Sequence, residues 1–142
     1  MLMGLIDRIK ERIKLKKILR LQGKSSFSKS VGHAMDGIHY TVSKERNFKI
    51  EIGMAFMVSV MGFVLKVSLM EWAVLVLTMA MVLALEMVNT AIERCVDLVT
   101  KDYRELAKIA KDVSAGAVLV MSLFSVVIGI VIFLPKIIVF IK

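Results

Sequence analysis

The strongest constraint on the fold is a run of 22 consecutive uncharged, mostly apolar residues at positions 113–134. As an α-helix with a rise of about 1.5 Å per residue, this run is roughly 33 Å long. That length is enough to cross the hydrocarbon core of a bilayer, which is about 30 Å thick. The run ends at Pro135 and Lys136, and it predicts a membrane-spanning helix.

Two further apolar segments, residues 52–65 and 72–85, contain fourteen uncharged residues each. Fourteen residues give only about 21 Å of helix, so each span must include flanking residues. The second span must continue past its apolar run, which carries Glu86 and Asn89 below the membrane surface. We expect a tight reversal at residues 68–72 between antiparallel spans. The spans are predicted at about 48–67, 72–97 and 110–134.

The composition and the distribution of charge agree with this interpretation. Hydrophobic residues make up 58% of the 142 residues, and the mean hydropathy is +0.77, whereas about half of a soluble domain is apolar. Of the twenty lysines and arginines, twelve precede position 50 and five lie in residues 94–111, against one in the first reversal and two after the third span. Basic residues are retained on the cytoplasmic side of membranes. We therefore expect a multi-pass membrane protein with a cytoplasmic N-terminus and second loop, and no nucleic-acid partner.

Two amphipathic helices are predicted before the first span. Residues 1–24 form a basic extension in which apolar side chains recur at helical spacing up to residue 13, and a break or turn is expected near residue 14. Residues 26–44 show the same spacing, which is typical of a helix lying in the headgroup plane. For the first of these helices, docking against a partner helix is the alternative. The predicted fold is an all-α integral membrane protein, in which amphipathic surface helices precede three transmembrane helices.

A stripe of polar residues marks the end of the second span. On a helix, Glu86, Asn89, Glu93 and Asp97 fall within an arc of roughly 80°. A carboxylate near the bilayer centre costs about 2.5 to 3.5 kcal/mol on the most lenient scale, so the stripe needs a compensating partner. Helix packing alone is the structural alternative, but serine or threonine would serve that purpose at lower cost.

Other charged residues are expected at the same membrane level as this stripe. Glu45 and Glu51 flank the start of the first span, and Lys111 and Asp112 flank the start of the third. Several carboxylates with few histidines suit a hard cation such as Mg²⁺, which keeps waters and substrate phosphates as ligands. A thiol or imidazole site is not favoured, because the two histidines do not share a helix face and the single cysteine points away from the stripe.

Three motifs together carry a resemblance to a known family. ERNF (45–48), LEMVNTAIERCVDL (85–98) and AKIAKDVSAGAV (107–118) resemble, in this order, the prokaryotic diacylglycerol kinase family of bacterial membrane kinases. The segments EWAVLV and IGIVIFLPK make the chain most similar to the Gram-positive undecaprenol kinase branch. The resemblance covers about residues 25–136. It implies a homotrimer in the bacterial plasma membrane that uses ATP and Mg²⁺ at cytoplasmic sites between subunits.

The resemblance also implies roles for individual residues. Glu86 matches the general base, with Asn89 as a supporting polar residue, and Glu45 and Glu93 match the carboxylates that hold Mg²⁺. The positions that match nucleotide contacts, or support them, are Asp97, Asp102, Tyr103, Arg104, Lys111 and Asp112. One departure is Ser26, which stands where the family commonly has an arginine.

The resemblance implies ATP-dependent phosphorylation of a membrane lipid alcohol. It favours undecaprenol, giving undecaprenyl phosphate, and diacylglycerol is the alternative substrate. A small channel is a different class, but it would need polar residues through the whole membrane, and the outer half of the second span offers only Thr78. A scaffold would leave the polar stripe unexplained.

Overall fold

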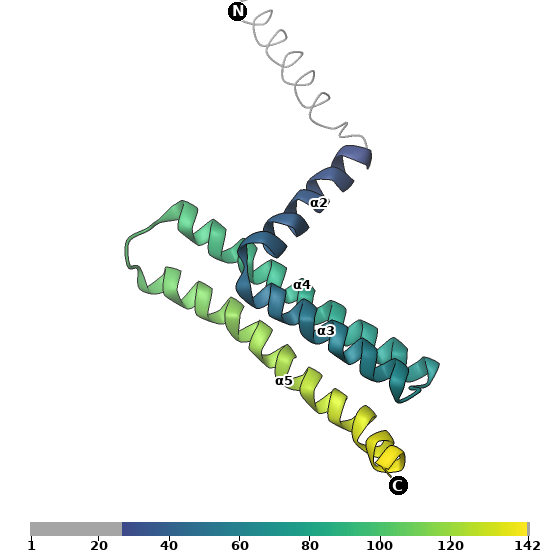
Figure 1. The fold of residues 1–142 in the computed structure, drawn as a ribbon. Helices are drawn as coiled ribbons and strands as arrows, with labels where there is room; N and C mark the ends of the chain where they lie inside the picture. The colour runs from purple at the N-terminus through teal and green to yellow at the C-terminus, as the bar shows by residue number, and fades with distance from the viewer. Residues whose placement is uncertain (1–26, 142) are drawn as a thin grey trace, which may run out of the picture. The chain divides into compact units, whose positions relative to one another are not determined.

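The computed structural model describes residues 27–141, and this part of the chain is helical apart from short connections. Within these described residues, four helices follow one another in the order α2, α3, α4 and α5 (Figure 1). Their bounds are Phe27–Lys44, Arg46–Val64, Leu69–Val99 and Glu105–Ile141. The predicted extension at residues 1–24 and the departure at Ser26 lie outside the described residues.

Helix α2 confirms the helix predicted at about residues 26–44. Among the described residues, 27–38 belong to one structural unit and those from His39 onward belong to another. Within α2, Phe27, Val31, Met35 and Ile38 recur at helical spacing, and all four side chains are exposed. The helix is therefore amphipathic, as expected, while its adsorption to a membrane surface stays a prediction.

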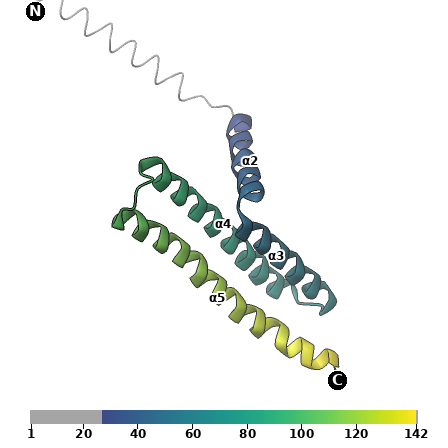
Figure 2. The same ribbon diagram turned by 60° about the vertical axis from the view of Figure 1, so that its left-hand side comes forward.

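Helices α3, α4 and α5 are each long and apolar enough to cross a membrane, which confirms the three expected spanning helices. Helix α4 packs against both of the others, and most extensively against α5; the three run alongside one another in both ribbon views (Figure 2). With 31 residues, α4 is about 46 Å long and exceeds the hydrocarbon core. Many large apolar side chains of these helices are exposed, so lipid or further protein must cover them.

Helix α5 extends beyond the predicted end of the third span at residue 134. It continues through Pro135 to Ile141. A proline inside a helix removes one backbone hydrogen bond, but apolar residues 137–141 follow it and continue the helical surface. The next residue, Lys136, is held by an ion pair with Glu71 of α4 at 3.0 Å. An apolar run read from the sequence therefore underestimates the length of this helix.

The connection between α3 and α4 is a tight reversal, as expected, and its polar groups are paired locally. Ser68 caps α4: its backbone N–H donates to the Glu71 carboxylate at 2.6 Å, and its hydroxyl accepts from the Glu71 N–H at 3.3 Å. Lys66 has a positive φ of 51°, which allows the chain to turn. The Trp72 ring lies so close to Gly62 that a Cβ there would come within 2.8 Å of it.

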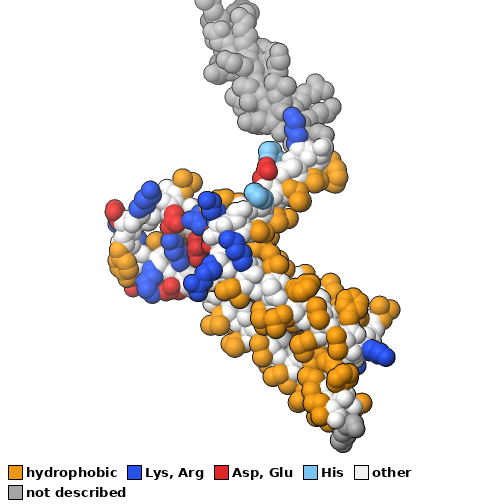
Figure 3. Space-filling view, viewed as in Figure 1, with side chains coloured by type: hydrophobic (Ala, Val, Ile, Leu, Met, Phe, Trp, Pro, Cys, Tyr) orange, Lys and Arg blue, Asp and Glu red, His pale blue; other side chains and the backbone are white. Residues whose placement is uncertain are grey.

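The two ends of the α3–α5 bundle differ in their buried residues. Next to the reversal, Val67, Leu75, Ile132 and Phe133 form an apolar cluster. We call this the reversal end. At the other end, which we call the charged end, the polar side chains of Glu86, Asn89, Thr90 and Ser114 are buried together with apolar ones. Figure 3 shows most acidic and basic side chains of the three helices gathered around the α4–α5 connection, with mainly apolar side chains over the remainder.

Candidate functional site

The polar stripe of α4 begins with a buried carboxylate. The exposed fraction of Glu86 is only 4%, and Asn89 and Thr90 on the same helix are almost as buried. The Asn47 side chain of α3 lies near the Glu86 carboxylate. Burying a carboxylate costs free energy unless the group is paired and hydrogen-bonded. Glu86 is therefore the first residue to explain at this end.

A second carboxylate, that of Glu51 on α3, lies near Glu86 of α4. The two are close enough to repel each other electrostatically. Within the part of the chain that the structure describes, Glu51 Oε2 is buried and has no hydrogen-bond partner. The sequence placed Glu51 at this membrane level, but nothing in it indicated that one oxygen would be left unpaired. An unpaired buried acceptor marks a place where a donor from outside the chain can bind.

The middle of the stripe is connected to α5 through a hydrogen-bond chain. Ser114 Oγ donates to Asn89 Oδ1 at 2.6 Å, and Asn89 Nδ2 donates to Glu93 Oε1 at 3.2 Å. The Ser114 hydroxyl also lies 2.9 Å from the carbonyl oxygen of Lys111. No pattern in the sequence indicated Ser114, because its contact depends on how α5 packs against α4.

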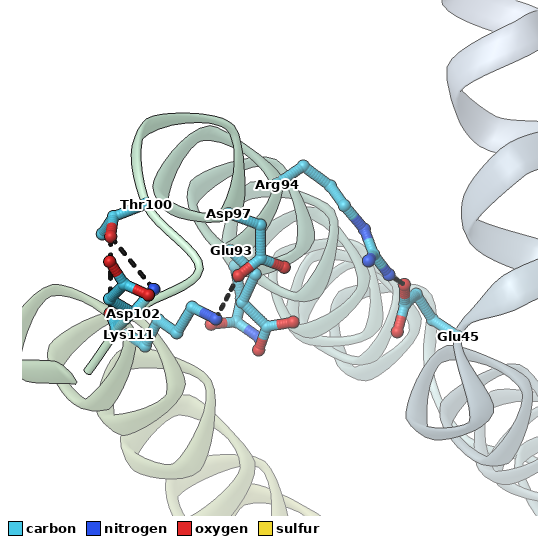
Figure 4. Close-up of polar contacts among 8 residues, drawn as sticks. Glu45, Glu93, Arg94, Asp97, Thr100, Asp102 and Lys111 are labelled. Atoms are coloured by element: carbon cyan, nitrogen blue, oxygen red, sulfur yellow. Dashed lines mark hydrogen bonds and ion pairs between the residues drawn. The ribbon is translucent and has the colours of Figure 1, made fainter. Parts of the chain in front are cut away.

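The end of the stripe forms an ion pair with α5. Lys111 Nζ lies 2.5 Å from Asp97 Oδ1. Figure 4 shows Glu93, Asp97 and Lys111 directed toward one another. Asp112 pairs with Lys108 one turn earlier on α5, at 2.5 Å. These pairs are partly exposed, so they add little stability, and an anionic ligand could displace the carboxylates from the lysines.

Glu45 forms an ion pair with an arginine that no pattern in the sequence indicated. Arg94 Nη2 lies 2.6 Å from Glu45 Oε1 (Figure 4), and its guanidinium lies 5.7 Å from the centre of the Tyr40 ring. Glu45 is the residue before α3, and its side chain does not cap that helix. Arg94 follows Glu93 directly, but it points away from the stripe toward the start of α3. No local pattern predicts a contact between residues 49 positions apart.

The donor atoms around Glu45 and Glu93 show whether these predicted ligands suit Mg²⁺. Glu45 and Glu93 are both near enough to Glu86 to repel it electrostatically. Among residues 27–141, no group of three or more histidine, cysteine or acidic residues is arranged to hold a metal ion. A pair of carboxylates without a third protein ligand fits Mg²⁺, which keeps waters and substrate phosphates as its other ligands. The assignment of Glu45 and Glu93 to Mg²⁺ stays a prediction.

At the α4–α5 connection lies an open cavity of about 360 Å³. All six residues that the resemblance assigned to nucleotide contacts, or to their support, line it: Asp97, Asp102, Tyr103, Arg104, Lys111 and Asp112. Lys101 and Lys108 line it as well, which gives the cavity four cationic side chains. The Thr100 hydroxyl accepts a hydrogen bond from the Asp102 N–H at 3.1 Å and so orders the loop. A cavity with several cations beside carboxylates can hold a polyphosphate together with a cation.

An apolar groove of about 310 Å³ lies among α3, α4 and α5. Glu51 lines it, together with apolar side chains that reach as far as Leu75 and Phe133 at the reversal end. Methionines are prominent in the lining, and their flexible side chains adapt to chains of irregular shape. The lining includes Met54, Met61, Met79, Ser122, Ser125 and Gly129. The groove can hold a hydrocarbon chain whose polar end points toward Glu51.

Comparison with known proteins adds an independent result. The sequence profile of a family described as prokaryotic diacylglycerol kinase matches residues 32–133, which include every predicted site residue. An undecaprenol kinase of Bacillus subtilis is 46% identical over 110 residues, covering 78% of this chain and 89% of that protein. A diacylglycerol kinase of Synechocystis is 41% identical over 107 residues, covering 75% of this chain and 61% of that protein. A diacylglycerol kinase of Escherichia coli K12 is 28% identical over 99 residues, covering 70% and 81% respectively.

Proposed function

Because this chain belongs to the prokaryotic diacylglycerol kinase family and is a lipid kinase, we propose that it phosphorylates undecaprenol with ATP and Mg²⁺. The observation that carries this proposal is the buried Glu86 carboxylate, which lies near Glu51 of the apolar groove and on the same polar stripe as Glu93. Undecaprenol is chosen over diacylglycerol because the Bacillus subtilis undecaprenol kinase is 46% identical to this chain.

In the proposed reaction, Glu86 is the general base. The lipid hydroxyl approaches from the membrane side and gives its proton to the Glu86 carboxylate, while its oxygen bonds to the γ-phosphorus of ATP. The bond between that phosphorus and the β,γ-bridging oxygen breaks, and ADP leaves. Little covalent chemistry is needed from a protein in phosphoryl transfer, so positioning and charge neutralisation provide most of the catalysis.

The remaining predicted residues serve the nucleotide in this proposal. Lys111 and Arg104 neutralise phosphate charge, with the other residues of the α4–α5 cavity around them. Glu45 and Glu93 hold Mg²⁺, which when bound lowers the repulsion between the phosphates and the incoming oxygen. Binding of Mg-ATP requires Arg94 to release Glu45, which leaves the guanidinium free to contact a phosphate oxygen.

We also propose that the charged end faces the cytoplasm and that the protein is a homotrimer. The excess of lysine and arginine at this end supports the orientation. The large exposed apolar surface of the three spanning helices supports contacts with further copies and with lipid. Both the assembly and the orientation follow the family resemblance.

The test presents undecaprenol and diacylglycerol separately to the purified protein in mixed micelles with saturating Mg-ATP, and compares kcat/KM. We expect lipid-dependent ADP release that chelation of Mg²⁺ abolishes, with the larger kcat/KM for undecaprenol. Equal or better use of diacylglycerol would replace undecaprenol as the substrate. ATP consumption that does not depend on added lipid would contradict the proposed reaction itself.

A further inference from the structure

We propose that Ser114 is a positioning residue for this site: its hydroxyl fixes the orientation of the Asn89 amide and thereby the Glu93 carboxylate. The proposal rests on the proposed function in one respect, since the role of Glu93 as a Mg²⁺ ligand belongs to it. The contact itself does not depend on that role. Ser114 Oγ lies 2.6 Å from Asn89 Oδ1, and Asn89 Nδ2 lies 3.2 Å from Glu93 Oε1.

The direction of the hydrogen bonds follows from what each group can donate. An ionised Glu93 carboxylate only accepts, so the Asn89 side chain must present its NH₂ group to it. The opposite edge of the amide is then the carbonyl oxygen, which needs a donor. The Ser114 hydroxyl supplies that donor across the α4–α5 contact. With the hydroxyl absent, the Asn89 carbonyl oxygen loses its donor, and the amide is held only through its bond to Glu93.

Burial makes this dependence strong. The exposed fractions are 7% for Ser114 and 8% for Asn89, so water has little access to replace a missing partner. A buried acceptor without a donor carries the full cost of its desolvation. Without the Ser114 hydroxyl, the Asn89 side chain should therefore adopt a different rotamer. The Ser114 proton has one competing acceptor, the Lys111 carbonyl oxygen at 2.9 Å, and that carbonyl belongs to the same helix as Ser114. Only the bond to Asn89 connects the hydroxyl to α4.

The two contacts between α5 and the stripe lie on either side of Glu93. Asn89, Glu93 and Asp97 are spaced four residues apart on α4, so they lie along one face of the helix. Ser114 holds Asn89, and Lys111, one turn earlier on α5, holds Asp97 at 2.5 Å. Glu93 therefore lies between two points where α4 is bonded to α5. One of its oxygens is held by Asn89, and the other can serve a cation.

The first experiment reads the amide directly and does not use activity. The chain contains only two asparagines, Asn47 and Asn89, so selective ¹⁵N-asparagine labelling gives two side-chain NH₂ signals. Asn47→Asp assigns them by removing one. In Ser114→Ala we expect the Asn89 signals to shift and to exchange faster with water, while those of Asn47 stay in place. Unchanged Asn89 signals in this variant would overturn the proposal.

Ser125→Ala is the matched control. It removes the same atom from the same helix, but the Ser125 hydroxyl bonds only to the Ser122 carbonyl within α5, at 2.7 Å. We expect this variant to leave both asparagine signals in place. A shift of the Asn89 signals in Ser125→Ala equal to that in Ser114→Ala would also overturn the proposal, because it would show a general effect of altering α5.

The second experiment measures the Mg²⁺ concentration that gives half-maximal kinase activity. Removing a group that orients a metal ligand typically costs about tenfold or more in metal affinity or activity. We expect about a tenfold rise for Ser114→Ala, with the KM for the lipid unchanged. An unchanged Mg²⁺ dependence would refute the connection to Glu93. If the wild type phosphorylates no lipid, the proposed function fails, and the asparagine signals still decide the role of Ser114.

Discussion

Glu71 at the reversal end and Glu86 at the charged end of the bundle lie in opposite electrostatic surroundings. At the reversal end, the Glu71 carboxylate accepts from the Ser68 N–H and pairs with Lys136, next to an apolar cluster. At the charged end, Glu86 is buried among the like charges of Glu45, Glu51 and Glu93, and one oxygen of Glu51 has no partner within the described chain.

This difference separates residues that stabilise the fold from residues that the rest of the fold must keep in place. A paired carboxylate at a helix start stabilises the folded chain. Carboxylates that repel one another destabilise it until a cation or a proton is bound. Variants at the two ends should therefore affect different measurements: stability at the reversal end, and turnover at the charged end.

The largest effect is expected for Glu86→Gln. The amide keeps the volume of the side chain but cannot accept the lipid proton, and the loss of a general base typically costs about 10²- to 10⁴-fold in rate. Removing one of several repelling charges should leave the thermal midpoint equal to or above that of the wild type. Initial rates and thermal unfolding in the same detergent check both parts. Turnover above about a tenth of wild type would contradict the role of Glu86.

Glu93→Gln should give the next largest effect. A neutral amide is a weaker ligand for Mg²⁺ than a carboxylate, so we expect the half-saturating Mg²⁺ concentration to rise by more than about tenfold. Activity should recover in part at high Mg²⁺, which would not happen for Glu86→Gln. A Mg²⁺ titration of both variants distinguishes a ligand from a base. Wild-type turnover at ordinary Mg²⁺ would refute the metal assignment.

Gly129→Leu tests the apolar groove between the two ends. No atom lies within 4 Å of a Cβ built on Gly129, so the new side chain can enter the groove without a clash at its base. We expect a several-fold higher KM for the lipid and an unchanged KM for ATP. Gly53→Leu is the control, because a Cβ there also meets open space and Gly53 does not line the groove. Equal effects of the two variants would argue against a lipid chain in the groove.

Gly62→Ala probes the packing of the reversal end. The added methyl would lie 2.8 Å from the Trp72 ring, which also contacts Phe63 with ring centres 4.8 Å apart. Overpacking of this kind costs about 1 to 3 kcal/mol. We expect a lower thermal midpoint with normal turnover for the folded fraction. A loss of kcat without a loss of stability would show that the two ends are not separable.

The smallest effect is expected for Glu71→Gln, which makes the same change on the same helix as Glu86→Gln. It weakens the ion pair with Lys136 and the charged part of the helix cap. Both groups are partly exposed, so the thermal midpoint should fall by a few degrees at most, and kcat should not change. The pair of variants is the most direct comparison of the two ends. A fall in kcat for Glu71→Gln similar to that for Glu86→Gln would contradict it.

The sequence predicted the features that depend on one helix at a time. The three spanning helices follow from apolar length, and the polar stripe on α4 follows from the periodicity of Glu86, Asn89 and Glu93. The gathering of six nucleotide-contact candidates in one cavity also agrees with their positions on both sides of a short loop. Their functional roles remain predictions.

The features that depend on contacts between helices could not be predicted. The Arg94–Glu45 pair joins residues 49 positions apart, and the Ser114–Asn89 bond joins residues 25 positions apart. Each requires the rotation of one helix against its neighbour, which apolar periodicity on a lipid-covered helix does not define. The continuation of α5 past Pro135 was missed for a similar reason, since Lys136 is accommodated by Glu71 of another helix.

Because α4 is one uninterrupted helix, it keeps residues near its two ends at a fixed separation along the membrane normal. Trp72 and Glu86 are 14 positions apart on it, which corresponds to about 21 Å along the helix axis. With Trp72 anchored at one boundary of a hydrocarbon layer about 30 Å thick, Glu86 lies roughly 9 Å inside the opposite boundary. A thicker bilayer would bury this carboxylate more deeply, and a thinner one would raise it toward the headgroups. Bilayer thickness therefore becomes a variable of the reaction, so turnover should pass through an optimum across phospholipids of increasing acyl-chain length.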